Sequence, residues 1–215
     1  MFLFEEIKLE GIVIYIIKYN SFEIEEYYPI LNPEEKNRIN EFSSLKRKRE
    51  FISTRILKSK HFPDKQICYT TSGAPFIDDE IFISISHTLG YSSIATSNKH
   101  IIGLDIEPKG TKASKLHTKF LNSEELSFLD TSNTDLMTRS WSCKEALLKL
   151  CNTKGLIFKK DLLIRSFDGN ELFECSFNKN GKQYSVTLRS IVLENMILTV
   201  NQSEPTLIEH QNGIN

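Results

Sequence analysis

Two stretches decide the fold that this chain can adopt: HIIGLDIE at residues 100–107 and TDLMTRSWSCKEALLKLC at residues 134–151. The first is apolar and β-branched up to its carboxylates, and Pro108 follows it, which predicts a strand that ends there. The second repeats apolar residues at helical spacing, and Asn152 with Gly155 provides a stop, which predicts a long helix. The pair indicates a mixed α and β protein.

Working outward from these stretches, the remaining elements fall into two similar sets. Buried or half-buried strands are predicted at 11–19, 81–87 and 91–97, and two helices from Pro33 to about His61, broken near Ser43–Ser44. A short helix is predicted at 120–129, and strand-like segments fill 161–200 with a hairpin turn at Asn180–Gly181. We expect an α+β fold with an N-terminal lobe, 1–108, and a C-terminal lobe, 109–215, joined by a loop or linker at 109–114.

Composition narrows the class of protein. The 215 residues include 27 basic and 28 acidic side chains, so the basic excess typical of broad nucleic-acid binding is missing. The longest apolar run, 11–17, is far shorter than the roughly 20 residues that cross a bilayer. No pair of the four cysteines has the spacing of a zinc knuckle or a redox site, and no signal peptide is visible. We expect a cytoplasmic protein with free thiols and neither nucleic acid nor membrane as a partner.

Asp105 and Glu107 are the first candidates for chemistry. Side chains two residues apart on a strand point to the same side, so these carboxylates can converge on a hard cation such as Mg²⁺. The plainer interpretation is that they are solvent-facing residues at the end of a strand.

The helix at 134–151 carries the next candidates. Trp141, Glu145 and Lys149 follow one another at four-residue intervals and therefore share one helix face. They could serve a reaction centre, or they could be a core tryptophan beside a surface Glu–Lys pair.

Two further groups could capture phosphate. Ser86–His87 ends the strand predicted at 81–87, and a basic run, 46–49, lies near Arg38. Each group could donate charge-assisted hydrogen bonds to a phosphate. Each could equally be structural, as a satisfied histidine and a solvated helix face.

The combination resembles a known family. GLDIE at 103–107 and WSCKEALLK at 141–149 are similar to the paired signature of the 4′-phosphopantetheinyl transferases, and the second motif matches at every fixed position. Weaker similarities flank the pair: SGAP at 72–75, ISISHT at 83–88, FLNSEEL at 120–126 and KGL at 154–156. The length resembles that of the surfactin-synthetase-activating (Sfp-type) branch.

The resemblance implies a fold and an activity. The fold would be two similar lobes, each a small antiparallel sheet packed with a helix, with the active site between them. The activity would be Mg²⁺-dependent transfer of the 4′-phosphopantetheine arm of coenzyme A to a serine of an apo acyl or peptidyl carrier protein, releasing 3′,5′-ADP. Mn²⁺ could replace Mg²⁺, and the protein would be a monomer.

The resemblance also implies roles for particular residues. Asp105, Glu107 and Glu145 would hold the metal, and Glu145 and Lys149 would be catalytic. Contacts to coenzyme A would come from a larger set: Arg38, Arg49, Gly73, Ala74, Pro75, Ser86, His87 and Lys149. The sequence departs from the family pattern at two positions: Ala74 stands where lysine is frequent, and Ser84 stands where asparagine is common. The role of Ser84 stays open.

Two other functions are compatible with the same residues. The chain could be a non-catalytic relic of this fold that binds carrier proteins or coenzyme A without transferring the arm. It could also be a different Mg²⁺-dependent enzyme that acts on phosphate esters.

Overall fold

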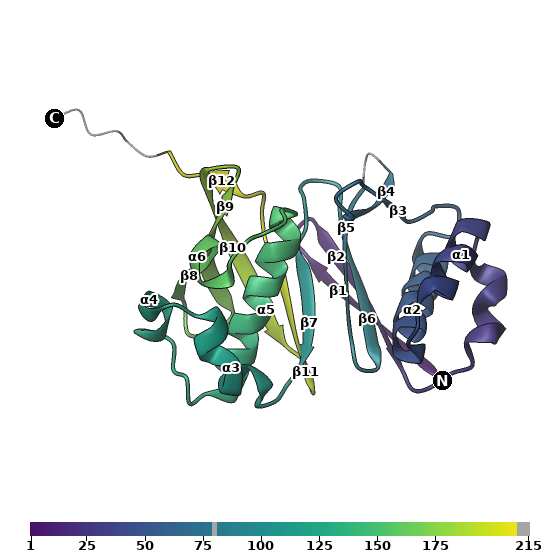
Figure 1. Cartoon of the computed structure of the whole chain (residues 1–215), viewed down its shortest axis with the longest axis horizontal. Helices are drawn as coiled ribbons and strands as arrows, with labels where there is room; N and C mark the ends of the chain where they lie inside the picture. Colours follow the sequence, from purple (N-terminus) through teal and green to yellow (C-terminus); the bar gives the residue numbers. More distant parts are fainter. Residues whose placement is uncertain (79–80, 210–215) are drawn as a thin grey trace. The chain divides into compact units, whose positions relative to one another are not determined.

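The computed structural model describes residues 1–78 and 81–209, and within them the chain divides into two compact units (Figure 1). The first unit is Met1–Ile106 and the second is Glu107–Asn215. The division falls within the strand that carries Asp105 and Glu107. The lobe boundary after residue 108 that the sequence suggests stays a prediction.

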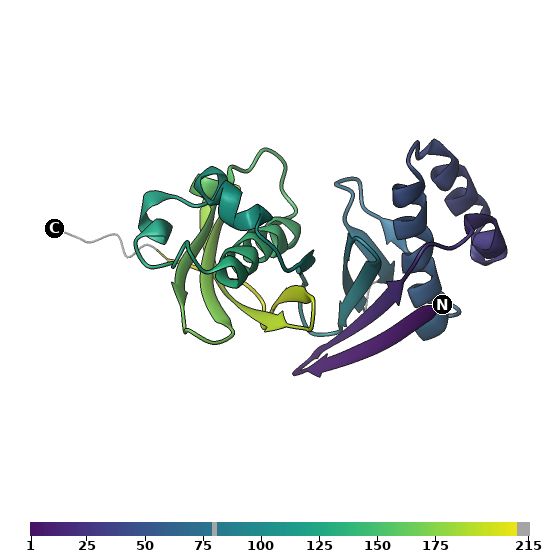
Figure 2. The ribbon, with the colours of Figure 1, turned by 90° about the horizontal axis from the view of Figure 1, so that it is seen from below.

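The first unit is built on one antiparallel sheet of six strands, in the order β1-β2-β6-β5-β4-β3. Figure 2 shows β1 and β2 as a long hairpin at the N-terminus. The elements are β1 (Phe2–Leu9), β2 (Ile12–Tyr19), a 3₁₀ helix η1 (Ile24–Ile30), α1 (Pro33–Glu41), α2 (Leu45–His61), β3 (Cys68–Tyr69), β4 (Pro75–Asp78), β5 (Ile81–Thr88) and β6 (Tyr91–Ser97).

Local capping fixes the two helices of this unit. Asn32 and Glu35 form a reciprocal capping box at the start of α1, and the Ser44 side chain accepts a hydrogen bond from the Arg47 amide at the start of α2. The predicted break near Ser43–Ser44 is confirmed. α2 packs on β2, β5 and β6, where Leu57 joins a buried aliphatic cluster with Ile17 and other side chains of the sheet.

The second unit repeats the plan of a sheet covered by helices. Its sheet has the order β7-β11-β10-β9-β8, and a short β12 pairs with β10. α5 packs on β8, β9, β10 and β11, and α3 packs on α5 (Figure 1). The elements are β7 (Leu104–Pro108), α3 (Lys112–Phe120), α4 (Ser123–Leu126), α5 (Thr134–Cys151), α6 (Phe158–Asp161), β8 (Leu162–Phe167), β9 (Leu172–Lys179), β10 (Lys182–Val192), β11 (Met196–Asn201) and β12 (Thr206–Leu207).

The α+β fold with two antiparallel, helix-covered sheets is confirmed, as are the bounds of α5. The predicted hairpin is also present, because Asn180 and Gly181 both have positive φ, 52° and 75°, between the paired residues Lys179 and Lys182.

Three local predictions are wrong. The loop or linker predicted at 109–114 is present at 109–111, but 112–114 begin α3, whose N-cap residue Thr111 makes no side-chain capping bond. The helix predicted at 120–129 is reduced to the single turn of α4. No strand was predicted at Phe2–Leu9, because most of its residues are exposed and its acidic pair hides any alternation.

One turn offers a test of the first unit. Gly90 has a φ of +75°, and a Cβ there would lie 3.0 Å from the Tyr19 carbonyl oxygen, whereas Gly181, with the same φ, has open space around it. Gly181→Ala should cost roughly 1–2 kcal/mol for the left-handed backbone alone. Gly90→Ala should cost at least about 1 kcal/mol more, because the β5–β6 turn must shift to relieve the clash.

Urea denaturation of both variants measures the difference. Equal losses of unfolding free energy would mean that the Tyr19 carbonyl moves away from the added methyl group without a loss of stability.

Candidate functional site

β7 presents the two carboxylates of the first motif. Asp105 is buried, with 5% of its surface exposed, and Glu107 is half-buried two residues further along the same strand. Residues two apart on a strand point to the same side, so both carboxylates face one side of β7. Their convergence on a cation stays a prediction, and the structure places both residues on one strand.

Two serines of β5 anchor this part of β7. Ser84 Oγ accepts a 2.9 Å hydrogen bond from the Leu104 amide. Ser86 Oγ accepts a 3.2 Å bond from the Ile106 amide and donates a 3.0 Å bond to Asp105 Oδ1. The serines thus bond to alternate amides of β7, and Ser86 also bonds to the Asp105 carboxylate. The sequence left the role of Ser84 open, and in the structure its hydroxyl bonds to the backbone of β7.

Glu107 is tied to the helix of the second motif. Trp141 Nε1 donates a 2.8 Å hydrogen bond to Glu107 Oε1. The indole ring stacks on Phe158 at 5.4 Å and meets the edge of Phe120 at 5.2 Å, which fixes its orientation. The strand motif and the helix motif therefore meet through Trp141 within the second unit.

The accessible face of α5 carries the predicted residues. Trp141, Glu145 and Lys149 are half-buried, while the side chains that point toward the sheet are fully buried, among them Cys143 and Leu147. Glu145 lies one turn beyond Trp141 on this face, so its carboxylate belongs to the same side of α5 that Trp141 joins to Glu107.

The other charged residue of the helix motif has a different place. Lys144 is completely buried, and its ammonium lies 2.7 Å from Glu125 Oε1 and 2.8 Å from the Phe120 carbonyl, with the Phe158 carbonyl at 3.1 Å. Burial lowers the pKa of Lys144, and the neighbouring carboxylate opposes that shift. Glu125 also accepts the amide hydrogens of Asn122 and Ile164. This ion pair is structural: it holds α4, α5 and β8 together.

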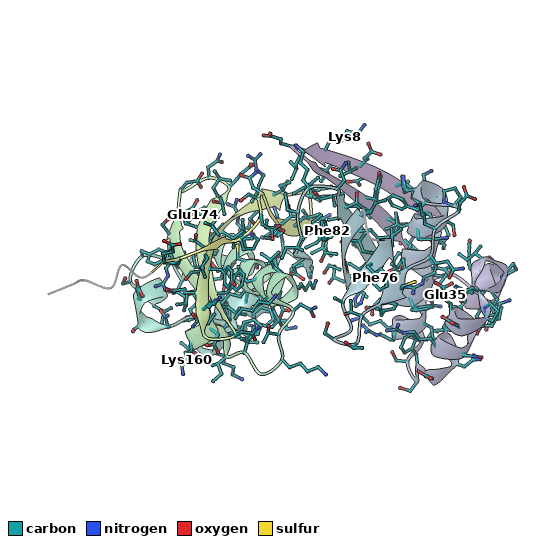
Figure 3. All side chains as sticks on the ribbon, turned by 90° about the horizontal axis from the view of Figure 1, so that it is seen from above. Lys8, Glu35, Phe76, Phe82, Lys160 and Glu174 are labelled. Atoms are coloured by element: carbon teal, nitrogen blue, oxygen red, sulfur yellow. The ribbon has the colours of Figure 1, made fainter. Side chains whose placement is uncertain are left out.

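A cavity of about 220 Å³ in the first unit gathers half of the predicted coenzyme A contacts. Arg38 lies over the Tyr69 ring at 4.0 Å, and Arg55 donates to Glu35 of α1 (Figure 3) at 2.8 Å and to the Tyr69 hydroxyl at 3.1 Å. Tyr69 therefore contacts both guanidinium groups, and Glu35 pairs with that of Arg55. The lining consists of Arg38, Phe42, Arg47, Glu50, Phe51, Thr54, Arg55, Tyr69, Gly73, Pro75, Ile85 and His87.

At one side of this cavity two side chains lie against the buried carboxylate of Glu50. Glu50 Oε2 lies 3.4 Å from His87 Nδ1 and 3.6 Å from Arg47 Nη1, and Arg47 Nη1 lies 3.1 Å from His87 Nε2. An arginine can only donate, so Nε2 accepts in this arrangement and the ring proton sits on Nδ1, toward Glu50. The coenzyme A contacts implied by the resemblance do not include Arg47, Glu50 or Arg55. Arg47 does belong to the basic run that the sequence offers for phosphate, and its i, i+3 spacing with Glu50 on a helix was a usable signal for their contact.

The other predicted contacts lie outside this lining. Arg49 donates a 3.1 Å hydrogen bond to the Phe22 carbonyl and lines a separate cavity of about 530 Å³. Ala74 lies in the turn between β3 and β4, where its amide donates to Thr70 Oγ1 and Gly73 adopts a φ of +89°. Gly73 and Pro75 thus reach the cavity, whereas Arg49 does not line it.

The carboxylates suit a hard cation in chemistry but do not form a complete protein cage. Among residues 1–78 and 81–209, no group of three or more His, Cys, Asp or Glu side chains is placed to hold a metal ion. Mg²⁺ usually takes only one or two protein carboxylates and completes its octahedron with water and substrate phosphates. Asp105 and Glu107, facing one side of β7, fit such a site.

Comparison with known protein families identifies the class of domain that carries these residues. Residues 101–200 match the 4′-phosphopantetheinyl transferase superfamily, and both motifs lie inside the matched range. The chain therefore carries a domain of this superfamily. No curated protein matches the chain. In the described part of the chain, none of the helices has the length and apolar composition needed to cross a bilayer.

The buried ion pair of the second unit can be tested with neighbouring residues. Glu125→Gln leaves the Lys144 ammonium buried without its carboxylate and should cost about 3–5 kcal/mol of unfolding free energy. Glu124→Gln changes an adjacent glutamate, which pairs with Arg165 at 3.4 Å and has 66% of its side chain exposed. It should change stability by less than about 1 kcal/mol.

Both variants can be compared with the wild type by urea denaturation. A loss below about 1 kcal/mol in Glu125→Gln would show that the pair does not hold these elements.

Proposed function

We propose that this protein transfers the 4′-phosphopantetheine arm of coenzyme A to a serine hydroxyl of an apo acyl or peptidyl carrier protein. The observation that carries the proposal is the 2.8 Å hydrogen bond from Trp141 to Glu107, because it joins the two motifs inside the matched domain. This bond brings the acidic strand β7 to the accessible face of α5, where Glu145 and Lys149 lie.

The reaction is a displacement at phosphorus. The carrier serine attacks the phosphorus that bears pantetheine, the bond to the bridging oxygen of the pyrophosphate breaks, and 3′,5′-ADP leaves. Glu145 accepts the serine proton, directly or through a water molecule. Lys149 donates to the pyrophosphate oxygens, where negative charge increases. Asp105, Glu107 and Glu145 would hold Mg²⁺, which would neutralise the negative charge that grows on the pyrophosphate as the leaving group departs.

The cavity of the first unit suits the phosphate-rich end of coenzyme A. Arg38 and Arg47 offer guanidinium groups for bidentate contacts, and His87 lies between Arg47 and Glu50. Gly73 has no side chain within the turn that borders the cavity, so backbone can approach a flat adenine ring. In this scheme Arg47 takes the place that the sequence prediction gave to Arg49.

The finer attributes follow from the same proposal. The enzyme would belong to the Sfp-type branch, act as a cytoplasmic monomer, and accept Mn²⁺ in place of Mg²⁺. Of the residues assigned to the reaction, Asp105 belongs to the first unit and Glu107, Glu145 and Lys149 belong to the second.

Intact-mass analysis tests the activity directly. Several apo acyl and peptidyl carriers are incubated with the protein, coenzyme A and Mg²⁺, and the carriers should gain the mass of one phosphopantetheine group. Formation of 3′,5′-ADP should require the carrier. Binding of coenzyme A without any mass gain would favour the binding relic, and release of 3′,5′-ADP without a carrier would favour another phosphoester enzyme.

Glu145→Gln separates catalysis from binding. The amide keeps size and helix propensity but loses the negative charge and the proton acceptor, so kcat should fall at least about 100-fold while coenzyme A still binds. Asp135→Asn is the control, because this exposed carboxylate of the same helix pairs only weakly with Lys109, at 3.5 Å. Near-normal kcat in Glu145→Gln would remove Glu145 from the mechanism.

A pair of arginine variants locates the 3′-phosphate of coenzyme A. The wild type should bind coenzyme A more tightly than dephospho-coenzyme A, since charge-assisted bonds to phosphate are strong. Arg38→Met should erase most of that preference, whereas Arg49→Met should keep it, because Arg49 lines a different cavity. Isothermal titration of both ligands against the three proteins measures the effect. The opposite result, with the preference lost in Arg49→Met alone, would place the phosphate in the other cavity.

A further inference from the structure

Ser86 makes a hydrogen bond to Asp105 that distinguishes it from Ser84. Both hydroxyls lie on the same side of β5, both serines are buried at 4% exposure, and both accept an amide hydrogen from β7. Ser86 also donates to Asp105 Oδ1 at 3.0 Å. Comparing variants of the two serines therefore measures the effect of the hydrogen bond to the Asp105 carboxylate.

A serine hydroxyl has only one hydrogen to donate. In Ser86 that hydrogen is directed at Asp105, and the oxygen receives the Ile106 amide. Ser86 could donate to a phosphate of coenzyme A only by releasing Asp105, and its low exposure leaves little room for such a contact. The geometry disfavours the coenzyme A contact that the family resemblance implies for this residue.

We propose that Ser86 is a positioning residue for the metal: its hydroxyl holds Asp105 Oδ1 and thereby aims the carboxylate at the cation. This inference rests on the proposed function, because that function assigns Asp105 to Mg²⁺. Carboxylates that bind metals are commonly oriented by a hydrogen bond of this kind, and removing the partner typically weakens metal affinity 10–100-fold. The bond also fixes which carboxylate oxygen of Asp105 faces Ser86, namely Oδ1.

The amide bond adds a second restraint. Because Ser86 Oγ accepts from the Ile106 amide, which belongs to the residue between Asp105 and Glu107, the same atom fixes both the backbone and the side chain of the metal-binding strand. Ser84 fixes only the backbone, at Leu104. A purely structural role would make the two serines equivalent, whereas a positioning role makes Ser86 special for metal binding.

The test measures Mn²⁺ binding, followed by the electron paramagnetic resonance signal of free Mn²⁺, in the presence of coenzyme A. Ser86→Ala should weaken Mn²⁺ binding about 10–100-fold. Ser84→Ala should lose thermal stability, since it gives up the bond to the Leu104 amide, but should leave Mn²⁺ affinity within about twofold of the wild type. Ser86→Cys, which retains a weak donor, should fall between the wild type and Ser86→Ala, and it serves as the test if Ser86→Ala does not fold.

Coenzyme A affinity in EDTA provides the second readout. Ser86→Ala should bind coenzyme A as the wild type does when no metal is present. A loss of that affinity would identify Ser86 as a direct ligand contact and overturn the inference, as would unchanged Mn²⁺ affinity in Ser86→Ala or equal losses in the two alanine variants. Mn²⁺ binding that depends on Ser86, in a protein that transfers no phosphopantetheine, would support the inference and reject the proposed function.

Discussion

The buried ammonium of Lys144 is the interaction on which the second unit depends. A fully buried charge is tolerated only with close partners, and Lys144 has a carboxylate at 2.7 Å and two carbonyl oxygens within 3.1 Å. Each partner belongs to a different part of the unit: Phe120 ends α3, Glu125 lies in α4, and Phe158 begins α6. Phe120 and Phe158 also enclose Trp141, so the ion pair supports the residue that reaches Glu107. Two adjacent residues of α5 thus have different surroundings: Lys144 lies in the interior, and Glu145 lies on the accessible face.

Side-chain hydrogen bonds hold β7 at both its backbone and its carboxylates. Hydroxyls of Ser84 and Ser86 bond to its amides at Leu104 and Ile106, and the indole of Trp141 bonds to Glu107. A strand fixed through backbone and side chains alike cannot easily rotate its carboxylates away from a common side. This restraint matters for phosphoryl transfer, in which catalysis depends largely on positioning and on electrostatic stabilisation.

Local signals in the sequence predicted most of the elements but not all of the site. The helix start at Pro33, the break near Ser43–Ser44, the apolar periodicity of α5 and the Asn180–Gly181 turn are short-range features, and the structure confirms each of them. Contacts across long sequence distances were not predictable. Arg47 meets His87 over 40 positions, and Trp141 meets Glu107 over 34, and neither partner signals the other along the chain. The start of α3 was missed for a different reason, because it lacks the capping bond that marks most helices.

Trp141 is the only tryptophan in the chain, and its position has a practical consequence. Its ring is half-buried between two phenylalanines, and its nitrogen bonds to a carboxylate of the acidic strand. Intrinsic fluorescence excited at the red edge of protein absorption therefore comes from one chromophore. A change in the charge or orientation of Glu107 alters the electric field at the indole, so the molecule contains its own optical reporter for events at β7, with no label attached.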